Sequence, residues 1–317
     1  MNTMETKNKE MRSVFVETLI DLAKTDDRIV LLDADLGKAG ATGTFAAAFP
    51  ERHLNAGVAE ANMVGLAAGL ASTGKIPFAQ SFACFASRRV FDQFFISAAY
   101  AQLPVKLVGT DPGVGAAFNG GTHMPFEDLG LMRMVPGLPI VEPSDPRSCQ
   151  ALLQAAARYV GPVYIRLYRK PLPFLYGPDE VFELGKAKVL KEGPKGSVVL
   201  LALGGIMVQE ALKGAAILEA QGIAVTVIDV LSLKPLDGDL ILAKASGARG
   251  VVTCENHQIH GALGSAVAEL LAEHRAAIPF ARVGIRDQFG EVGTEQWLKE
   301  HFKLDAESIV DTVKSLL

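Results

Sequence analysis

Short apolar runs rich in β-branched residues alternate with Ala-rich stretches along the chain. The runs near residues 28–33, 76–81, 105–109 and 163–167 have the length and composition of buried strands. Between them, apolar residues at helical spacing predict helices over residues 45–49, 60–70, 85–101, 126–135 and 145–159. Continuous apolar strands separated by helices are typical of a parallel sheet covered on both faces. The pattern therefore predicts an α/β fold.

The alternation of predicted strands and helices stops near residue 170, where prolines and charged residues accumulate, and starts again near residue 198. Further strands are predicted near residues 198–203, 224–230, 250–254 and 280–283, with helices between and after them. We therefore predict two consecutive open-sheet α/β domains, residues 1–175 and 196–317, joined by a linker over residues 176–195. The polar segment Met1 to Lys9 is interpreted as a frayed tail.

Composition narrows the class of protein. The chain has 317 residues with a formal net charge of −4, which makes a nucleic-acid partner improbable. It has neither a signal-peptide pattern nor an apolar run of membrane-spanning length, so we expect a cytoplasmic protein that does not bind a membrane. Cys84, Cys149 and Cys254 are far apart in apolar runs, which favours buried thiols over disulfides or a zinc site.

The glycine and histidine motifs are weak. Gly37, Gly40 and Gly43 follow a strand but fit neither dinucleotide nor P-loop spacing, so a flexible loop is the better interpretation. His257 and His260 are three residues apart, but nothing nearby completes a metal-binding set. We predict no metal site in this chain.

The ends of the predicted strands carry more information. Glu60 starts a helix directly after a strand-like segment, where an acid either complements the helix dipole or contacts a ligand. Phe82, Phe85 and Arg88 follow the next strand at spacings of three, as either a core stripe or a site for a flat ring and a phosphate.

Two further strand ends carry histidine and arginine. His123 closes a Gly-rich loop, either in a first helical turn capped by Thr122 or as a donor in a cleft. Arg166 and Arg169 end another strand, either as solvated surface cations or as a pair of cations that suits an anionic group.

Several of these segments together resemble the transketolase family. Residues 55–71 resemble its pyrimidine-binding segment, and residues 81–88 resemble the ring-stacking segment that follows. The later matching segments are residues 121–128, 134–145, 164–169, 252–257 and 261–264, so the likeness covers nearly the whole chain in the right order. The family's Gly-Asp-Gly motif for metal and diphosphate is absent from the sequence. The chain thus resembles the C-terminal subunit of a split transketolase.

This resemblance implies a fold, a cofactor and a partner. The fold is the pyrimidine-binding domain of the thiamine-diphosphate enzymes followed by the transketolase C-terminal domain. The cofactor is thiamine diphosphate, and a separate N-terminal subunit would hold the diphosphate and Mg²⁺ or another divalent cation. The expected assembly is α2β2, without which the chain would be inactive. The expected reaction moves a two-carbon ketol unit from a ketose phosphate to an aldose acceptor.

The resemblance also implies roles for particular residues. Glu60 would be the acid that hydrogen-bonds the aminopyrimidine ring, and an acid fixed at a helix start against apolar walls fits that role. Phe85 would stack on this ring beside Phe82, with Asp35 and Leu36 near the thiazolium side. The sugar phosphate would be bound by the residues His123, Asn119, Arg88 and Arg169, with His123 near the reacting carbon.

Some positions depart from the family pattern and keep alternatives open. Ala61 and Asn119 stand where many transketolases carry His and an acid, and Asn can donate as well as accept. Arg88 stands where 1-deoxyxylulose-5-phosphate synthases carry Arg, so an activity of that kind is one alternative. The others are the β subunit of a 2-oxo-acid dehydrogenase and a non-catalytic partner of another chain.

Overall fold

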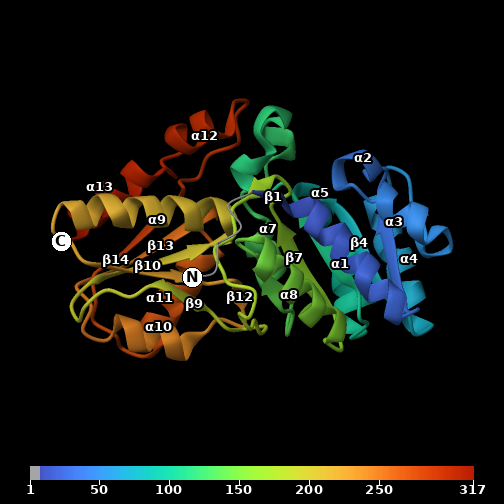
Figure 1. Cartoon of the computed structure of the whole chain (residues 1–317), viewed down its shortest axis with the longest axis horizontal. Helices are drawn as coiled ribbons and strands as arrows, with labels where there is room; N and C mark the ends of the chain where they lie inside the picture. Colours follow the sequence, from blue (N-terminus) through green and yellow to red (C-terminus); the bar gives the residue numbers. More distant parts are fainter. Residues whose placement is uncertain (1–7) are drawn as a thin grey trace. The chain divides into compact units, whose positions relative to one another are not determined.

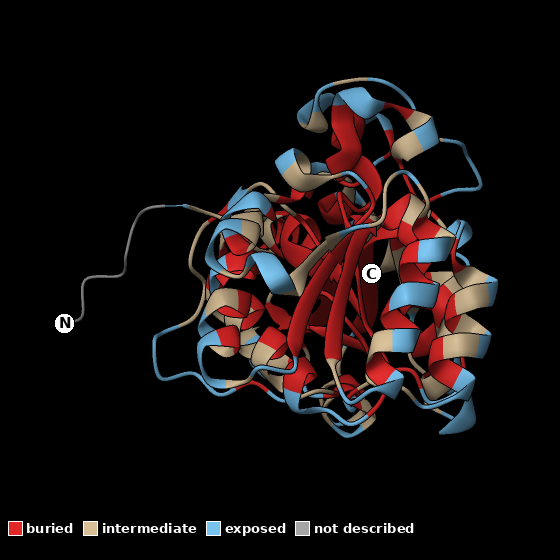
Figure 2. Ribbon diagram, turned by 90° about the vertical axis from the view of Figure 1, so that its right-hand side faces the viewer, coloured by how far each residue is buried: buried red, intermediate tan, exposed pale blue. Residues whose placement is uncertain are grey.

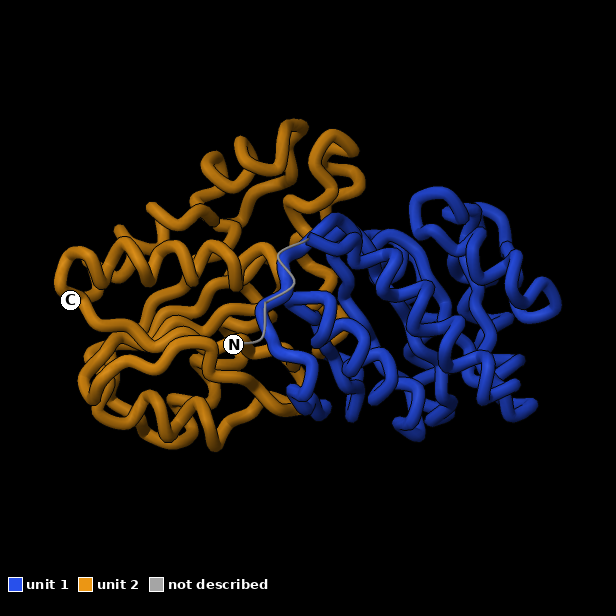
Figure 3. The backbone as a smooth tube through the Cα atoms, in the orientation of Figure 1, with its two compact units in different colours: residues 1–112, 134–184 blue, residues 113–133, 185–317 orange. Residues whose placement is uncertain are grey.

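The computed structural model describes residues 8–317 and groups them into two compact units (Figure 3). Unit 1 contains the residues up to Pro112 together with Met134–Leu184, and unit 2 contains Gly113–Arg133 and Gly185–Leu317. Each unit is built around an open, mainly parallel sheet (Figure 1), which confirms the predicted fold class. The segment Gly113–Arg133 belongs to unit 2, although the sequence placed it inside the first domain.

The sheet of unit 1 is parallel and runs in the order β6-β7-β5-β4-β2-β3. In that order the strands are Ile140–Val141, Val163–Leu167, Lys106–Thr110, Ile76–Phe82, Ile29–Asp33 and His53–Asn55. Every residue of β2, β5 and β7 is buried, as expected for strands of a parallel sheet covered on both faces, and Figure 2 shows buried strands between the flanking helices.

Helices flank this sheet. The long ones are α1 (Met11–Thr25), α4 (Glu60–Ser72) and α8 (Pro146–Arg158), and the short ones are α2 (Gly37–Gly40), α3 (Gly43–Ala48), α5 (Ala83–Arg88) and α6 (Phe91–Gln93). The 3₁₀ turn η1 covers Pro50–Arg52 and the π-helical η2 covers Phe94–Tyr100. Helices α1 and α8 pack side by side, and α4 packs against β2 and β4. Asp145 caps α8 by accepting a hydrogen bond from the Ser148 amide at 2.7 Å.

The sheet of unit 2 runs in the order β14-β13-β10-β11-β9. These strands are Phe280–Ile285, Gly250–Gln258, Val198–Leu203, Val225–Asp229 and Lys188–Lys191, and only β9 is antiparallel to its neighbour. The helices are α7 (Asp128–Arg133), α9 (Gly204–Ala220), α10 (Gly238–Ala245), α11 (Leu263–Glu273), α12 (Glu295–His301) and α13 (Ala306–Leu316). The unit also contains the 3₁₀ segments η3 (Gly113–Asn119) and η4 (Gly121–His123), and the short strand β12 (Ser232–Lys234).

The first described residues form a short β-strand that pairs with a later segment of unit 1. Strand β1 (Lys9–Glu10) forms an antiparallel pair with β8 (Pro171–Leu172). The interpretation of residues 1–9 as a frayed tail is therefore wrong at Lys9, and its first seven residues lie outside the described part of the chain.

Several elements differ from the sequence predictions. The residues interpreted as a flexible loop are helical, since Gly37 and Gly40 bound α2 and Gly43 begins α3. The helix expected over residues 85–101 is broken after Arg88, because Val90 leaves the helical conformation and is fully buried. Helix α1 was not predicted. Strand β9 lies inside the predicted linker, because its lysines and its partly exposed edge position hide the apolar pattern of a strand.

Two other sequence expectations can be compared with the structure. Cys84, Cys149 and Cys254 are buried thiols, as predicted, and no disulfide is present among the described residues. Within residues 8–317 we find no helix with the length and apolarity needed to cross a bilayer.

Arg166 lies in the core of unit 1 rather than at an anion site. Its side chain is fully buried, and its Nη1 donates to both carboxylate oxygens of Glu142, at 3.2 and 3.0 Å. The interpretation of Arg166 as a cation for an anionic group is therefore wrong, because a carboxylate of the same unit already neutralises it.

Lys106, at the start of β5, is the other buried cation of this sheet. Its Nζ donates to the carbonyl oxygens of Tyr159 at 2.8 Å and Gly161 at 2.6 Å. Burial lowers the pKa of Lys106 to about 7.

This lowered pKa predicts a pH-dependent stability. Above about pH 7 the unfolded chain, with a lysine pKa of about 10.4, binds more protons than the folded chain. The contribution of Lys106 to the free energy of unfolding should therefore rise with pH by up to about 1.4 kcal/mol per unit until about pH 10. Urea denaturation of wild type and Lys106→Met across this range checks the sign. A difference between the two proteins that does not change with pH would contradict it.

Candidate functional site

The predicted site residues of unit 1 follow the carboxyl ends of its parallel strands. Phe82 ends β4, Arg169 follows β7, Asp35 follows β2, and Glu60 begins α4 soon after β3. The carboxyl ends of parallel strands share one edge of a sheet, which is where open α/β sheets bind ligands. The topology therefore brings these four residues to a single edge.

Glu60 is the buried acid of this edge. Only 5% of its surface is exposed, and both carboxylate oxygens accept hydrogen bonds from Nη1 of Arg89, at 2.9 and 3.1 Å. The Arg89 guanidinium also lies over the ring of Phe85, 3.9 Å from its centroid. One cation thus contacts the two residues to which the family resemblance assigns the pyrimidine ring.

Arg89 was not among the predicted site residues, whereas its neighbour Arg88 was. Arg88 is exposed, and its Nε donates to the carbonyl oxygen of Cys84 at 3.3 Å. Arg89 stands four residues after Phe85, a spacing that places side chains on the same face of a helical turn. That spacing is the sequence signal that could have identified it.

Phe82 and Phe85 form a tilted aromatic pair with ring centroids 6.2 Å apart. Both rings are partly exposed, and the face of Phe85 already carries the flat guanidinium of Arg89. A face that holds one planar, electron-poor group can hold another, such as an aminopyrimidine ring. The residues present therefore fit the ring of thiamine diphosphate.

Arg169 is held in place beside this aromatic pair. Its Nε lies 2.7 Å from Oδ1 of Asp111, its Nη1 donates to the Ala39 carbonyl, and its guanidinium lies 5.5 Å from the Phe82 ring centroid. Burial raises the pKa of Asp111, while Arg169 acts in the opposite direction. Arg169 is thus a positioned cation at the edge of the sheet, 22% of its side chain being exposed.

Asp35 and Leu36 form the turn after β2. Asp35 is exposed and has a positive φ of 61°, and its amide donates to Oδ1 of Asn55 at 3.1 Å. The amide of Leu36 donates to Oδ1 of the buried Asp33 at 3.2 Å. The other oxygen of Asp33 contacts Thr42 Oγ1 at 2.6 Å and His53 Nε2 at 2.9 Å. Sequence analysis missed Asp33 as the residue that organises this turn, although an acid at the last position of a buried strand signals it.

Asn119 and His123 belong to unit 2. Asn119 is exposed at the end of η3, and His123 is partly exposed in the single turn η4. Nδ1 of His123 lies 2.9 Å from the hydroxyl of Thr122. Gly120, rather than Thr122, precedes this turn, so the interpretation of Thr122 as a helix cap is wrong.

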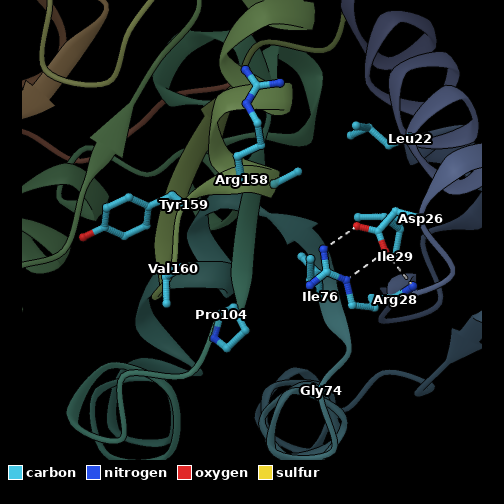
Figure 4. A pocket seen from close by; sticks show the side chains of 11 residues that line it. Leu22, Asp26, Arg28, Ile29, Gly74, Ile76, Pro104, Arg158, Tyr159 and Val160 are labelled. Atoms are coloured by element: carbon cyan, nitrogen blue, oxygen red, sulfur yellow. Dashed lines mark hydrogen bonds and ion pairs between the residues drawn. The ribbon is translucent and has the colours of Figure 1, made fainter.

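Unit 1 also contains a cavity of about 370 Å³, shown in Figure 4. Arg28 and Ile76 mark the amino ends of β2 and β4 in its wall, beside the last residues of α8. An ion pair joins Arg28 to Asp26 there at 2.8 Å. The cavity lies at the sheet edge opposite the strand ends that carry Glu60 and Phe82, so it contains none of the candidate residues.

Comparison with family models gives two matches. Residues 7–173 match the pyrimidine-binding domain of transketolase, and residues 185–309 match the transketolase C-terminal domain.

Similar chains include two proteins named as transketolase subunits and a solved split gene transketolase. The 6-deoxy-6-sulfo-D-fructose transketolase subunit SqwH of Clostridium sp. (strain MSTE9) is 49% identical over 95% of this chain and 92% of its own length. An apulose-4-phosphate transketolase subunit of Actinobacillus succinogenes is 36% identical over 97% of this chain and 98% of its own. A solved chain described as a split gene transketolase in an inactive β4 tetramer superposes with a TM-score of 0.89. The two sequences are 44% identical, and the superposition covers 97% of this chain and 98% of the solved chain.

Proposed function

Because this chain belongs to the transketolase family, we propose that it is the C-terminal subunit of a split transketolase and works with a separate N-terminal subunit. The main support for this proposal is the extent of the similarity. The chain matches the pyrimidine-binding and C-terminal domains of transketolase, and it covers 92% and 98% of the lengths of two relatives named as subunits. The expected complex contains two copies of each subunit. In it, the partner holds the cofactor's diphosphate and a divalent cation such as Mg²⁺.

The residues at the sheet edge of unit 1 fit the cofactor. Thiamine diphosphate, when bound, supplies a carbanion that breaks and forms carbon–carbon bonds next to a carbonyl group. Phe85 offers the ring face for the pyrimidine, Phe82 lines the same surface, and Asp35 and Leu36 form the adjacent turn. Glu60 holds a proton against the pyrimidine ring nitrogen, which is the catalytic role we propose for it.

The remaining candidates bind the sugar. Arg169, together with Arg88 at the end of α5, supplies positive charge for the distal anionic group of the substrate. His123 and Asn119 hydrogen-bond its hydroxyl and carbonyl oxygens. The sugar in the name of the SqwH relative carries a sulfonate and the sugar in the name of the other relative carries a phosphate. Both groups are tetrahedral anions that a guanidinium binds.

Arg89 should compete with the cofactor, because it contacts both Glu60 and Phe85. Its side chain is 49% exposed, so the two contacts together contribute about 1 kcal/mol. Arg89→Met should therefore lower the half-saturating thiamine diphosphate concentration of the two-subunit enzyme by about fivefold. Arg158→Met, an exposed arginine at the opposite edge of the sheet, is the control and should leave that concentration unchanged. A higher half-saturating concentration in Arg89→Met would mean that Arg89 holds the cofactor instead.

The experiment that tests the proposed function is a donor and acceptor panel with the assembled complex, thiamine diphosphate and Mg²⁺. The sugar donors are xylulose 5-phosphate and 6-deoxy-6-sulfo-D-fructose, pyruvate is tested as a 2-oxo acid, and ribose 5-phosphate and glyceraldehyde 3-phosphate are the acceptors. Ketol transfer from either donor supports the proposal. Product formed only from pyruvate and glyceraldehyde 3-phosphate would favour a deoxyxylulose-phosphate synthase, and decarboxylation of a 2-oxo acid alone would favour a dehydrogenase subunit.

A further inference from the structure

Strand β13 of unit 2 anchors the segment that carries Asn119 and His123. The amide of Val114 donates to Oδ1 of Asn256 at 3.0 Å, and the amide of Gly130 donates to Nε2 of His257 at 3.2 Å. The next residue, Gln258, donates its amide to the Phe126 carbonyl at 2.9 Å. Three consecutive residues of one strand thus bind the segment Gly113–Arg133 on both sides of Asn119 and His123, at Val114 before them and at Phe126 and Gly130 after them.

The two side chains in this anchor are built into the core of the unit. Asn256 is 2% exposed and His257 is 1% exposed. Nδ1 of His257 faces the Gln258 carbonyl at 2.7 Å, so this nitrogen carries a proton and Nε2 accepts from Gly130. A single tautomer of His257 therefore satisfies both partners.

The segment Gly113–Arg133 also packs closely against the rest of unit 2. A Cβ added at Gly113, whose φ is +49°, would lie 2.6 Å from the backbone oxygen of Asn256. The rings of Phe126 and Phe302 meet edge to face with centroids 5.2 Å apart. Between these contacts Ala117 has φ 48° and ψ −119°, a strained conformation that persists only where the surroundings hold it.

We propose that Asn256 and His257 are positioning residues, which fix the backbone of Gly113–Arg133 and thereby hold His123 and Asn119 at the substrate. The inference rests on the function proposed above, since it gives the C-terminal domain a role in sugar binding. Substrate contacts lose their effect when their backbone shifts by about 1 Å, so a positioning residue acts on turnover without touching substrate.

The test uses the assembled complex with four variants. Asn256→Leu removes the acceptor for the Val114 amide, and Asn256→Asp keeps an acceptor oxygen there. Gly113→Ala disrupts the same contact from the side of the loop, because its Cβ would clash with Asn256. Gly222→Ala is the control for this variant. Gly222 also has a positive φ, of +79°, but a Cβ there would meet nothing within 4 Å.

The measured quantities are kcat/KM for the sugar donor, half-saturation by thiamine diphosphate, Tm, and hydrogen exchange of peptides covering residues 113–133. Asn256→Leu and Gly113→Ala should lower kcat/KM about 10- to 100-fold and speed exchange in this segment, with cofactor half-saturation unchanged. Asn256→Asp should recover part of the loss, and Gly222→Ala should match wild type.

Two results would overturn the inference. One is wild-type kcat/KM in Asn256→Leu and Gly113→Ala although exchange in the segment is faster. The other is an equal loss of kcat/KM in Gly222→Ala, or a loss of kcat/KM across the variants that correlates with Tm and cofactor half-saturation and not with hydrogen exchange of residues 113–133. A wild-type complex that transfers no ketol unit from any donor would contradict the proposed function itself, and would differ from both results because the control protein would then be inactive.

Discussion

Glu60→Gln is expected to lower turnover of the proposed two-subunit enzyme by at least about 100-fold. Glutamine keeps the size and shape of the buried side chain, but it cannot exchange a proton with the pyrimidine ring. The ion pair with Arg89 is also lost, which costs little stability because the Arg89 side chain is 49% exposed. Assembly with the partner should therefore persist while ketol transfer is lost, and a coupled assay on the purified complex measures this.

The matched control is Glu51→Gln, an exposed carboxylate in the turn before β3. It should leave turnover and assembly at wild-type values. An intact complex in which Glu60→Gln keeps more than half of the wild-type turnover would remove Glu60 from the reaction and favour the non-catalytic alternative.

The second large effect concerns stability. Glu142→Ala should lower the free energy of unfolding by about 3–5 kcal/mol, because it leaves the fully buried Arg166 guanidinium without its carboxylate. Denaturation with urea, followed by circular dichroism, measures the loss. Asp21→Ala is the control: it breaks an ion pair with Lys24 in which both side chains are 61% exposed, and it should cost less than about 1 kcal/mol.

A double variant separates the charge from the packing at this pair. Replacing both Arg166 and Glu142 with Met should recover much of the stability that Glu142→Ala loses, because no unpaired charge is then buried. If Glu142→Ala instead unfolds with the same midpoint as wild type, the ion pair does not hold this part of unit 1 together.

The fold was predictable because its strands are buried on both faces. In β2 and β10 every residue is buried and nearly all are apolar, so these runs directly indicate strands of a covered parallel sheet. Strand β9 was missed because an edge strand has no such run. The predicted helix over residues 85–101 failed for another reason: helical periodicity continues through Arg89 and Val90, while the backbone leaves the helix there to bury Val90.

The sequence could identify only those site residues whose location follows from their position relative to a predicted strand. Glu60, Phe82 and Arg169 were identifiable because they follow strands whose ends share one edge. The pairing of Glu60 with Arg89 was not, since it joins residues 29 apart in sequence across two elements. Arg166 was misinterpreted for the same reason, as its partner Glu142 is 24 residues away after the neighbouring strand. The roles assigned to the site residues stay predictions.

The measurement that tests the central claim most directly is ketol transfer by the separate and combined subunits. This chain, the N-terminal subunit, and a mixture of the two at increasing ratios would each be assayed with a ketose phosphate donor, an aldose phosphate acceptor, thiamine diphosphate and Mg²⁺. We predict turnover in the mixture alone, with activity saturating at one copy of each subunit. Full turnover by this chain without the second subunit would contradict the account.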